Sequence, residues 1–133
     1  MSNWQNLNHA VSLAPGEVIE IEWQGDDLLL YRTSAGEYRA ITAYCPHMGN
    51  YIPNGLAPGQ SLSGLLQQDE LRCPYHGWRF NGEGQCTHIP QGQRIPVVVR
   101  RGRAVARTWR VREENGRVQI AGLNQGLTTI EPS

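Results

Sequence analysis

The chain has 133 residues, which predicts a single domain, and its apolar runs, such as Leu28–Tyr31, are far too short for a transmembrane span. Charged residues make up 18% and apolar residues 39%, so the chain is not a charge-driven disordered tail. Twelve basic and twelve acidic residues cancel, which disfavours nucleic acid or an anionic membrane as a partner. Residues 1–5 lack the basic and apolar regions of a secretory signal, so we expect a cytoplasmic protein.

The charges are unevenly distributed along the chain. Residues 1–44 contain six acidic residues and two arginines, whereas residues 94–117 contain eight arginines and two acidic residues. Either a solvated strand face or a docking surface for a partner explains the arginines, and the sequence alone favours the solvated face.

Short strand patterns separated by turns dominate the chain. In order, strands are predicted at Val18–Trp23, Leu28–Arg32, Tyr38–Tyr44, Val105–Arg112 and Arg117–Ile120. Turns are predicted at residues 25–27 and 34–37, and Asn115-Gly116 predicts a hairpin between the last two strands.

The pattern predicts a mostly β fold, a small antiparallel β sandwich or barrel, formed by one domain over residues 1–133. No window has clean helical periodicity, so no long helix is expected. A Gly/Pro-rich region, from Cys45 to Pro96, separates the two groups of strands, and within it Ile52–Leu66 is predicted to be an extended loop. Residues 123–133 are predicted to be a flexible tail because they have little to bury.

Two short Cys/His pairs in the Gly/Pro-rich region point to a metal centre. Cys45-Pro46-His47 and Cys73-Pro74-Tyr75-His76 each follow a strand-like segment, and 25 residues separate the pairs. A Rieske [2Fe-2S] centre needs two cysteines on one iron and two histidines on the other, and each pair supplies one of each.

Three other interpretations of these residues stay open at this point. A structural zinc site could use the same four ligands, although zinc sites usually pair cysteine with cysteine and histidine with histidine. A disulfide between Cys45 and Cys73 would leave both histidines unexplained and does not suit a cytosolic protein. A Cys/His nucleophile would need only one of the two pairs.

The wider pattern resembles the Rieske proteins of the ferredoxin and oxygenase branch. Cys-Pro-His and Cys-Pro-Tyr-His-Gly-Trp (residues 45–47 and 73–78) resemble the two cluster-binding boxes of that family, and the resemblance covers most of the chain. The segment Gly84–Pro90 resembles Rieske oxygenases of the steroid-hydroxylase and cholesterol-desaturase kind.

The resemblance implies a β fold with an inserted cluster-binding subdomain, at about residues 45–90, and one [2Fe-2S] cluster per chain. Cys45 and Cys73 would ligate the inner iron, and His47 and His76 the outer iron. The loop disulfide of quinol-oxidising Rieske proteins cannot form, because Asn50 and Tyr75 occupy the corresponding positions. Trp78 stands where that branch has a hydroxyl residue near a cluster sulfur, which implies a low potential.

The remaining inventory does not supply an oxygenase active site. Such a site needs a mononuclear iron held by two histidines and a carboxylate, but only His9 and His88 remain, 79 positions apart. Cys86 is expected to be a buried structural residue. We therefore expect a ferredoxin-like electron carrier, not an enzyme on its own, with a reductase and a terminal oxygenase as partners. The alternatives are a separately encoded Rieske subunit of a steroid-type oxygenase and a zinc-binding interaction module.

Overall fold

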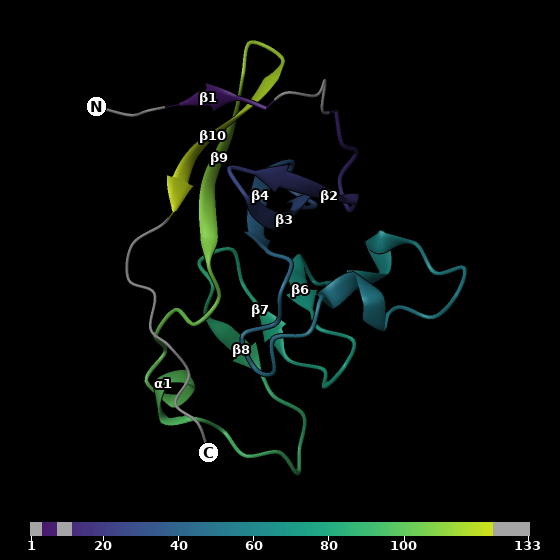
Figure 1. The fold of residues 1–133 in the computed structure, drawn as a ribbon, viewed down its shortest axis with the longest axis vertical. Helices are drawn as coiled ribbons and strands as arrows, with labels where there is room; N and C mark the ends of the chain where they lie inside the picture. The colour runs from purple at the N-terminus through teal and green to yellow at the C-terminus, as the bar shows by residue number, and fades with distance from the viewer. Residues whose placement is uncertain (1–3, 8–11, 124–133) are drawn as a thin grey trace.

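Two antiparallel sheets make up the fold in the computed structural model, which describes residues 4–7 and 12–123 (Figure 1). The strands of the first sheet are β1 (Gln5–Asn6), β2 (Val18–Trp23), β3 (Asp26–Arg32), β4 (Tyr38–Thr42), β9 (Thr108–Glu114) and β10 (Arg117–Leu123). Their order across the sheet is β1-β10-β9-β4-β3-β2.

The second sheet is smaller and is inserted in the chain between β4 and β9. It contains, in this spatial order, β5 (Leu66–Gln67), β6 (Glu70–Arg72), β7 (Arg79–Phe80) and β8 (Cys86–His88). Figure 1 shows the first sheet in the upper half of the molecule and the second sheet, with the short helix α1 (Val97–Arg100), in the lower half. The mostly β, antiparallel prediction with an inserted subdomain is therefore confirmed.

Helices are short throughout the described ranges, as the absence of helical periodicity predicts. Besides α1, they contain only the 3₁₀ helices η1 (Ile52–Gly55) and η2 (Leu62–Leu65). In residues 4–7 and 12–123, no helix has the length and apolar character needed to cross a membrane. The predicted tail lies mostly outside the described residues, and its first residue, Leu123, ends β10.

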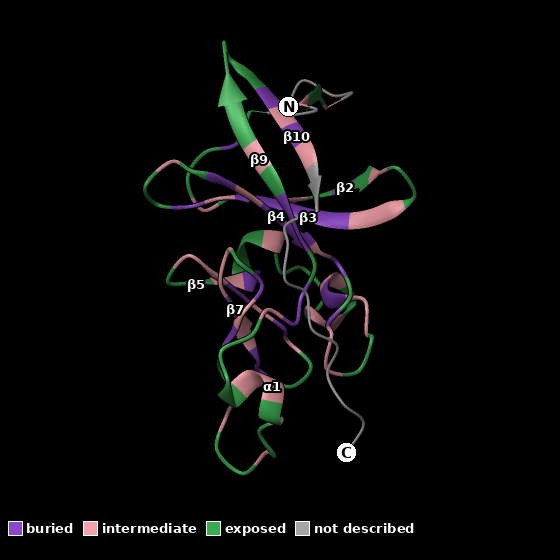
Figure 2. Cartoon of the chain, turned by 90° about the vertical axis from the view of Figure 1, so that its left-hand side faces the viewer, coloured by how far each residue is buried: buried purple, intermediate pink, exposed green. Residues whose placement is uncertain are grey.

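Strand β3 is buried on both of its faces, which explains its uninterrupted apolar run. Leu29 and Tyr31 belong to the core shared with the cluster-binding subdomain, whereas Leu28 and Leu30 belong to a second core under Trp109 and the β9–β10 hairpin. Alternate residues of a strand point to opposite faces, so the stretch Leu28–Tyr31, which is covered on both sides, is apolar throughout. Figure 2 shows this buried strand at the middle of the molecule, between the upper and lower halves.

The turn between β2 and β3 falls earlier than the predicted residues 25–27. Trp23 pairs with Asp26, so only Gln24 and Gly25 form the turn, with φ of 50° and 85°. Two consecutive positive φ angles are the requirement of a two-residue type I′ hairpin, and Asp26 and Asp27 therefore become strand residues. The predicted Asn115-Gly116 hairpin is confirmed, with φ of 53° and 77°.

Two predicted strand boundaries are wrong because the chain leaves the first sheet to enter the subdomain. Strand β4 ends at Thr42, before the loop that carries Cys45. Strand β9 begins at Thr108 instead of residue 105, because the N–H groups of Val105 and Ala106 donate to the Gly84 carbonyl, at 2.9 and 3.0 Å.

The segment predicted as an extended loop, residues 52–66, is a packed element. It contains η1, η2 and the first residue of β5, and its residues Ile52 and Leu65 are buried in the subdomain core. Pro53 in the first turn of η1 explains the helix start, since its fixed φ suits that position. The remainder of the segment folds through apolar contacts with the core, which the sequence does not reveal.

Gly84 is predicted to be far more sensitive to substitution than Gly25. Both have positive φ, but a Cβ at Gly84 would collide with the backbone carbonyl of Ala106, whereas the space beside Gly25 is open. Gly25→Ala should cost about 1 kcal/mol, from the left-handed conformation alone. Gly84→Ala should cost about 3 kcal/mol or more, because overpacking is added. Urea unfolding of both variants measures this difference, and equal losses would contradict it.

Candidate metal centre

The two Cys/His loops close with the same hydrogen-bond pattern. In loop 1 (residues 45–50), the N–H of Cys45 donates to the Asn50 carbonyl at 2.8 Å, and the N–H of Gly49 donates to the Cys45 carbonyl at 2.7 Å. In loop 2 (residues 73–78), the N–H of Cys73 donates to the Trp78 carbonyl at 2.8 Å, and that of Gly77 donates to the Cys73 carbonyl at 2.9 Å. Each cysteine therefore opens a turn that its own backbone groups close.

A glycine with positive φ occupies the fifth position of each loop. The φ angles of Gly49 and Gly77 are 76° and 80°, a conformation that other residues adopt only at a cost. At Gly77 there is also no room for a side chain, since a Cβ would lie 2.8 Å from the Pro90 ring. The glycines therefore allow both loops to turn tightly around the same space.

The fold brings all four predicted site residues together. Cys45 and Cys73 are 1% and 0% exposed and are free thiols that share a hydrogen bond. The imidazole rings of His47 and His76 lie 4.8 Å apart between centroids, nearly perpendicular to each other. Thus a thiol pair lies in the core and an imidazole pair lies nearer the surface.

Backbone N–H groups of the two loops donate to both sulfur atoms. The hydrogen bond between the thiols lowers the pKa of Cys73, and the backbone N–H groups of Tyr75 and His76 lower it further. The backbone N–H groups of His47 and Met48 donate to the Cys45 sulfur in the same way, although its pKa is raised by the shared hydrogen bond and by burial. Backbone donors to both sulfurs are what a buried anionic centre requires.

His47 has a free ligand atom inside the site. Its Nδ1 is buried and has no hydrogen-bond partner among the described residues, which is unusual for a buried polar atom. Burial, together with the nearby His76, lowers the pKa of His47, which favours the neutral imidazole. A neutral, unpartnered and buried nitrogen fits a metal ligand.

The arrangement of the donors in two pairs fits a two-iron cluster. In a Rieske cluster each iron takes only two protein ligands, which matches one thiol pair and one imidazole pair. Both thiols are buried, so neither is accessible as a nucleophile.

Four further residues support the site, and the sequence singles out one of them, Trp78, as a neighbour of the cluster. The Trp78 indole is fully buried and stacks on His47, with centroids 4.0 Å apart and planes 9° apart. Its Nε1 donates to Gln93. Tyr44 and Tyr51 flank loop 1 and donate to Asp27 and Glu20, each at 2.7 Å, which ties the loop to the first sheet. The second cluster-binding box identifies Trp78, but no local signal identifies the tyrosines or Gln93.

The other candidate residues lie away from the loops or outside the description. Cys86 is buried, as expected, and its thiol donates to the His88 carbonyl. His88 is exposed, and His9 lies outside the described residues.

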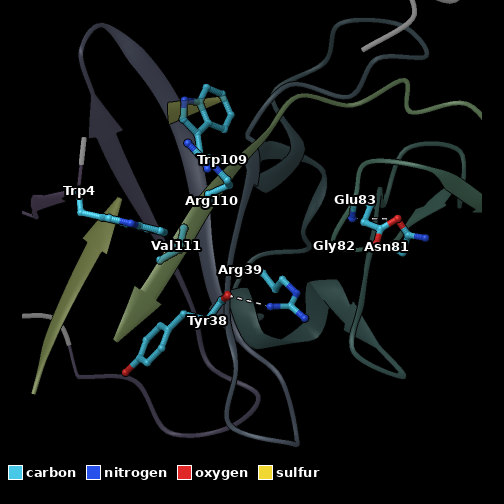
Figure 3. Close-up of a pocket in the computed structure, with 9 residues that line it drawn as sticks. All are labelled: Trp4, Tyr38, Arg39, Asn81, Gly82, Glu83, Trp109, Arg110 and Val111. Carbon is cyan, nitrogen blue, oxygen red and sulfur yellow. Dashed lines mark hydrogen bonds between the residues drawn. The ribbon is translucent and has the colours of Figure 1, made fainter. Parts of the chain in front are cut away.

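Of two hollows on the described part of the surface, one reaches loop 1 and the other does not. The first, of about 510 Å³, lies between β4, β9 and the turn at residues 81–83, where Arg39 covers Gly82 (Figure 3). Its lining residues are Trp4, Tyr38, Arg39, Asn81, Gly82, Glu83, Trp109, Arg110 and Val111. The second, of about 490 Å³, includes Cys45, Pro46 and Gly49 in its wall. The first hollow therefore lies away from the two Cys/His loops.

Comparison with known proteins gives a consistent result. Cholesterol 7-desaturase from Ciona intestinalis is 33% identical over 114 residues, which cover 86% of this chain and 22% of that protein. The oxygenase component of 3-ketosteroid-9-alpha-monooxygenase from Rhodococcus rhodochrous is 32% identical over 123 residues, which cover 92% of this chain and 28% of that protein. These relatives are of the steroid and cholesterol kind that the sequence resembles.

A solved structure and a family match complete the comparison. Apo dicamba monooxygenase superimposes with a TM-score of 0.69 at 26% identity, covering 91% of this chain and 33% of that one. The chain thus spans only about a fifth to a third of these relatives. The Rieske [2Fe-2S] domain matches residues 3–100, in agreement with the paired loops and their four donor groups. The chain therefore belongs to the Rieske [2Fe-2S] domain family.

Proposed function

We propose that this chain is a ferredoxin-type carrier, which takes one electron from a reductase and passes it to a terminal oxygenase. The observation that supports this most directly is the position of the imidazole pair. His76 is exposed and His47 is half-buried, whereas both cysteines are buried. An electron can therefore reach a partner protein through a short path on the histidine side.

The ligand assignment is part of this proposal. Cys45 and Cys73 hold the buried iron, and the imidazoles of His47 and His76 hold the outer iron. When bound, the cluster supplies reversible one-electron chemistry. The residues around it bury the sulfur side, donate N–H groups to the sulfurs and orient the imidazoles toward the surface.

A Rieske subunit of a steroid-type oxygenase, encoded separately from its catalytic chain, is the second candidate. It is favoured by the similarity to the Ciona desaturase and the Rhodococcus oxygenase component over most of this chain. Purification from native cells separates the two. A stable complex with a catalytic chain supports the subunit, and transient transfer to a separable oxygenase supports the carrier. In either case we propose a cytoplasmic location.

The exposed side chains around His76 form the docking surface in this proposal. Met48 is 65% exposed and Tyr75 is 41% exposed, and both flank the ligand positions. Trp78 is fully buried under His47, so it cannot contact a partner. Arg94, Arg100, Arg101 and Arg103 are exposed on the segment around α1 and would attract an acidic partner.

The cluster ligands can be tested one by one. Wild-type protein purified without oxygen should contain about two irons and two acid-labile sulfides per chain. Alanine at Cys45, His47, Cys73 or His76 should abolish stable cluster incorporation, because an iron then loses a protein bond. Cys86→Ser is the control, and should keep the cluster at a cost of about 1–2 kcal/mol in stability. One tightly held zinc without sulfide in the wild-type protein would instead support the zinc-binding module.

The midpoint potential should be low for a Rieske protein. The Trp78 N–H donates to Gln93 and not to a sulfur, and Asn50 and Tyr75 cannot form a loop disulfide. Fewer donors to sulfur stabilise the reduced cluster less. Voltammetry should give a value at or below about 0 mV, within the roughly −150 to +300 mV range of these centres. A value near the upper end would place the chain with the quinol-oxidising branch.

Charged substitutions on the docking surface should slow electron transfer. Met48→Glu and Tyr75→Glu should reduce the rate to the native oxygenase about tenfold without changing the visible spectrum, because transient redox interfaces are small. Ser61→Glu, an exposed site on another segment, is the control. Replacing Arg100, Arg101 and Arg103 by Gln should matter mainly at low salt. Wild-type rates in the two docking variants, measured by rapid mixing, would refute this surface.

A further inference from the structure

We infer that Gln93 is a positioning residue for the cluster, which links loop 2 to the His47 ligand of loop 1. The inference concerns the metal centre itself and is independent of which protein receives the electron. It rests on two hydrogen bonds, one ring stack and the packing of the segment that carries Gln93.

Both the oxygen and the nitrogen of the Gln93 side-chain amide form hydrogen bonds with loop 2. Its Oε1 accepts from Trp78 Nε1 at 2.8 Å, and its Nε2 donates to the His76 carbonyl at 2.8 Å. Both partners belong to loop 2, on either side of Gly77. One side chain therefore restrains the backbone of a ligand histidine and the indole that follows it.

Trp78 connects Gln93 to loop 1 by stacking on His47. Its indole lies parallel to the His47 ring, with centroids 4.0 Å apart, and it is fully buried. Because His47 Nδ1 has no hydrogen-bond partner in the described structure, the indole stack and the edge contact with the His76 ring orient this imidazole. Rotation of the indole would tilt the His47 ring and redirect Nδ1.

The peptide that Gln93 contacts is itself part of the sulfur environment. The His76 carbonyl and the Gly77 N–H belong to one peptide unit, whose N–H donates to the Cys73 carbonyl at 2.9 Å. The preceding peptide unit donates the His76 N–H to the Cys73 sulfur. Gln93 thus stabilises the orientation of the donors around Cys73 as well as that of Trp78.

The segment that carries Gln93 is held against loop 2 by a second contact. The Pro90 ring lies so close to Gly77 that a Cβ there would be 2.8 Å from it, and the Gln93 N–H donates to the Pro90 carbonyl at 3.4 Å. Residues 90–93 therefore form a short turn packed on loop 2, and Gln93 has a defined position from which to span both partners.

Gln93→Leu removes both hydrogen bonds at nearly constant size, and the holoprotein provides the readouts. Loss of a partner that orients a metal ligand typically costs 10–100-fold in metal affinity. We expect about tenfold faster release of iron to a chelator, a shifted midpoint potential, and an altered nitrogen hyperfine coupling of one imidazole in pulsed electron paramagnetic resonance. Gln91→Leu, at an exposed glutamine of the same turn, should match the wild type in all three.

Two further variants identify the route of the effect. Gln93→Glu keeps the acceptor for Trp78 and loses the donor to the His76 carbonyl. Its imidazole coupling should therefore equal that of the wild type, whereas its iron release should stay faster than in the wild type. Trp78→Phe keeps a ring beside His47 but removes the N–H that Gln93 accepts. Adding Gln93→Leu to Trp78→Phe should change iron release and imidazole coupling less than adding it to the wild-type protein, because the hydrogen bond between the two residues is already lost.

The inference is overturned if Gln93→Leu behaves like Gln91→Leu in iron release, potential and imidazole coupling. If Gln93→Leu does not yield a folded holoprotein, the Gln93→Glu variant tests the inference in its place. Iron release and potential equal to those of the wild type in that variant would also overturn it, whereas a change in both would support it.

Discussion

The metal centre depends on one pattern of backbone hydrogen bonds that occurs in both loops. In each loop, a cysteine N–H reaches the carbonyl five residues later and its carbonyl accepts from the glycine four residues later. This ring fixes the direction of the cysteine side chain and leaves the N–H groups of the intervening residues free to face its sulfur. Without two such rings facing one another, the buried thiols would not lie side by side.

The two loops differ in where the histidine falls, and the asymmetry of the site follows from it. His47 is two residues after its cysteine and lies half-buried on Trp78, whereas His76 is three residues after its cysteine and is exposed. In the ligand assignment that we propose, the buried indole holds one imidazole in a fixed orientation and the other imidazole is accessible from the surface. The cluster would thus be supported on one side and exposed on the other.

The sheets hold these loops at a constant separation. Loop 1 emerges from β4 and is tied back to β2 and β3 by the hydrogen bonds of Tyr51 to Glu20 and Tyr44 to Asp27. Loop 2 connects β6 and β7, and η1 packs on it, since a Cβ at Gly55 would lie 2.5 Å from the Pro74 ring. Residues 52–66, which lie between the loops, therefore support loop 2, and their buried residues Ile52 and Leu65 anchor them in the core.

The sequence by itself determined what local chemistry dictates. The Asn115-Gly116 hairpin follows from the φ angles of those two residues, the β class from alternation and turn spacing, and the four donor residues from the unusual Cys/His spacing. The tertiary structure alone decided how distant segments meet. Residues 52–66 fold because the core accepts Ile52 and Leu65, and Trp78 is buried because His47 comes from another loop. Gln93 reaches Trp78 only because Pro90 packs on Gly77. These contacts join residues from about 15 to 30 positions apart, and no local pattern of residue types encodes such a pairing.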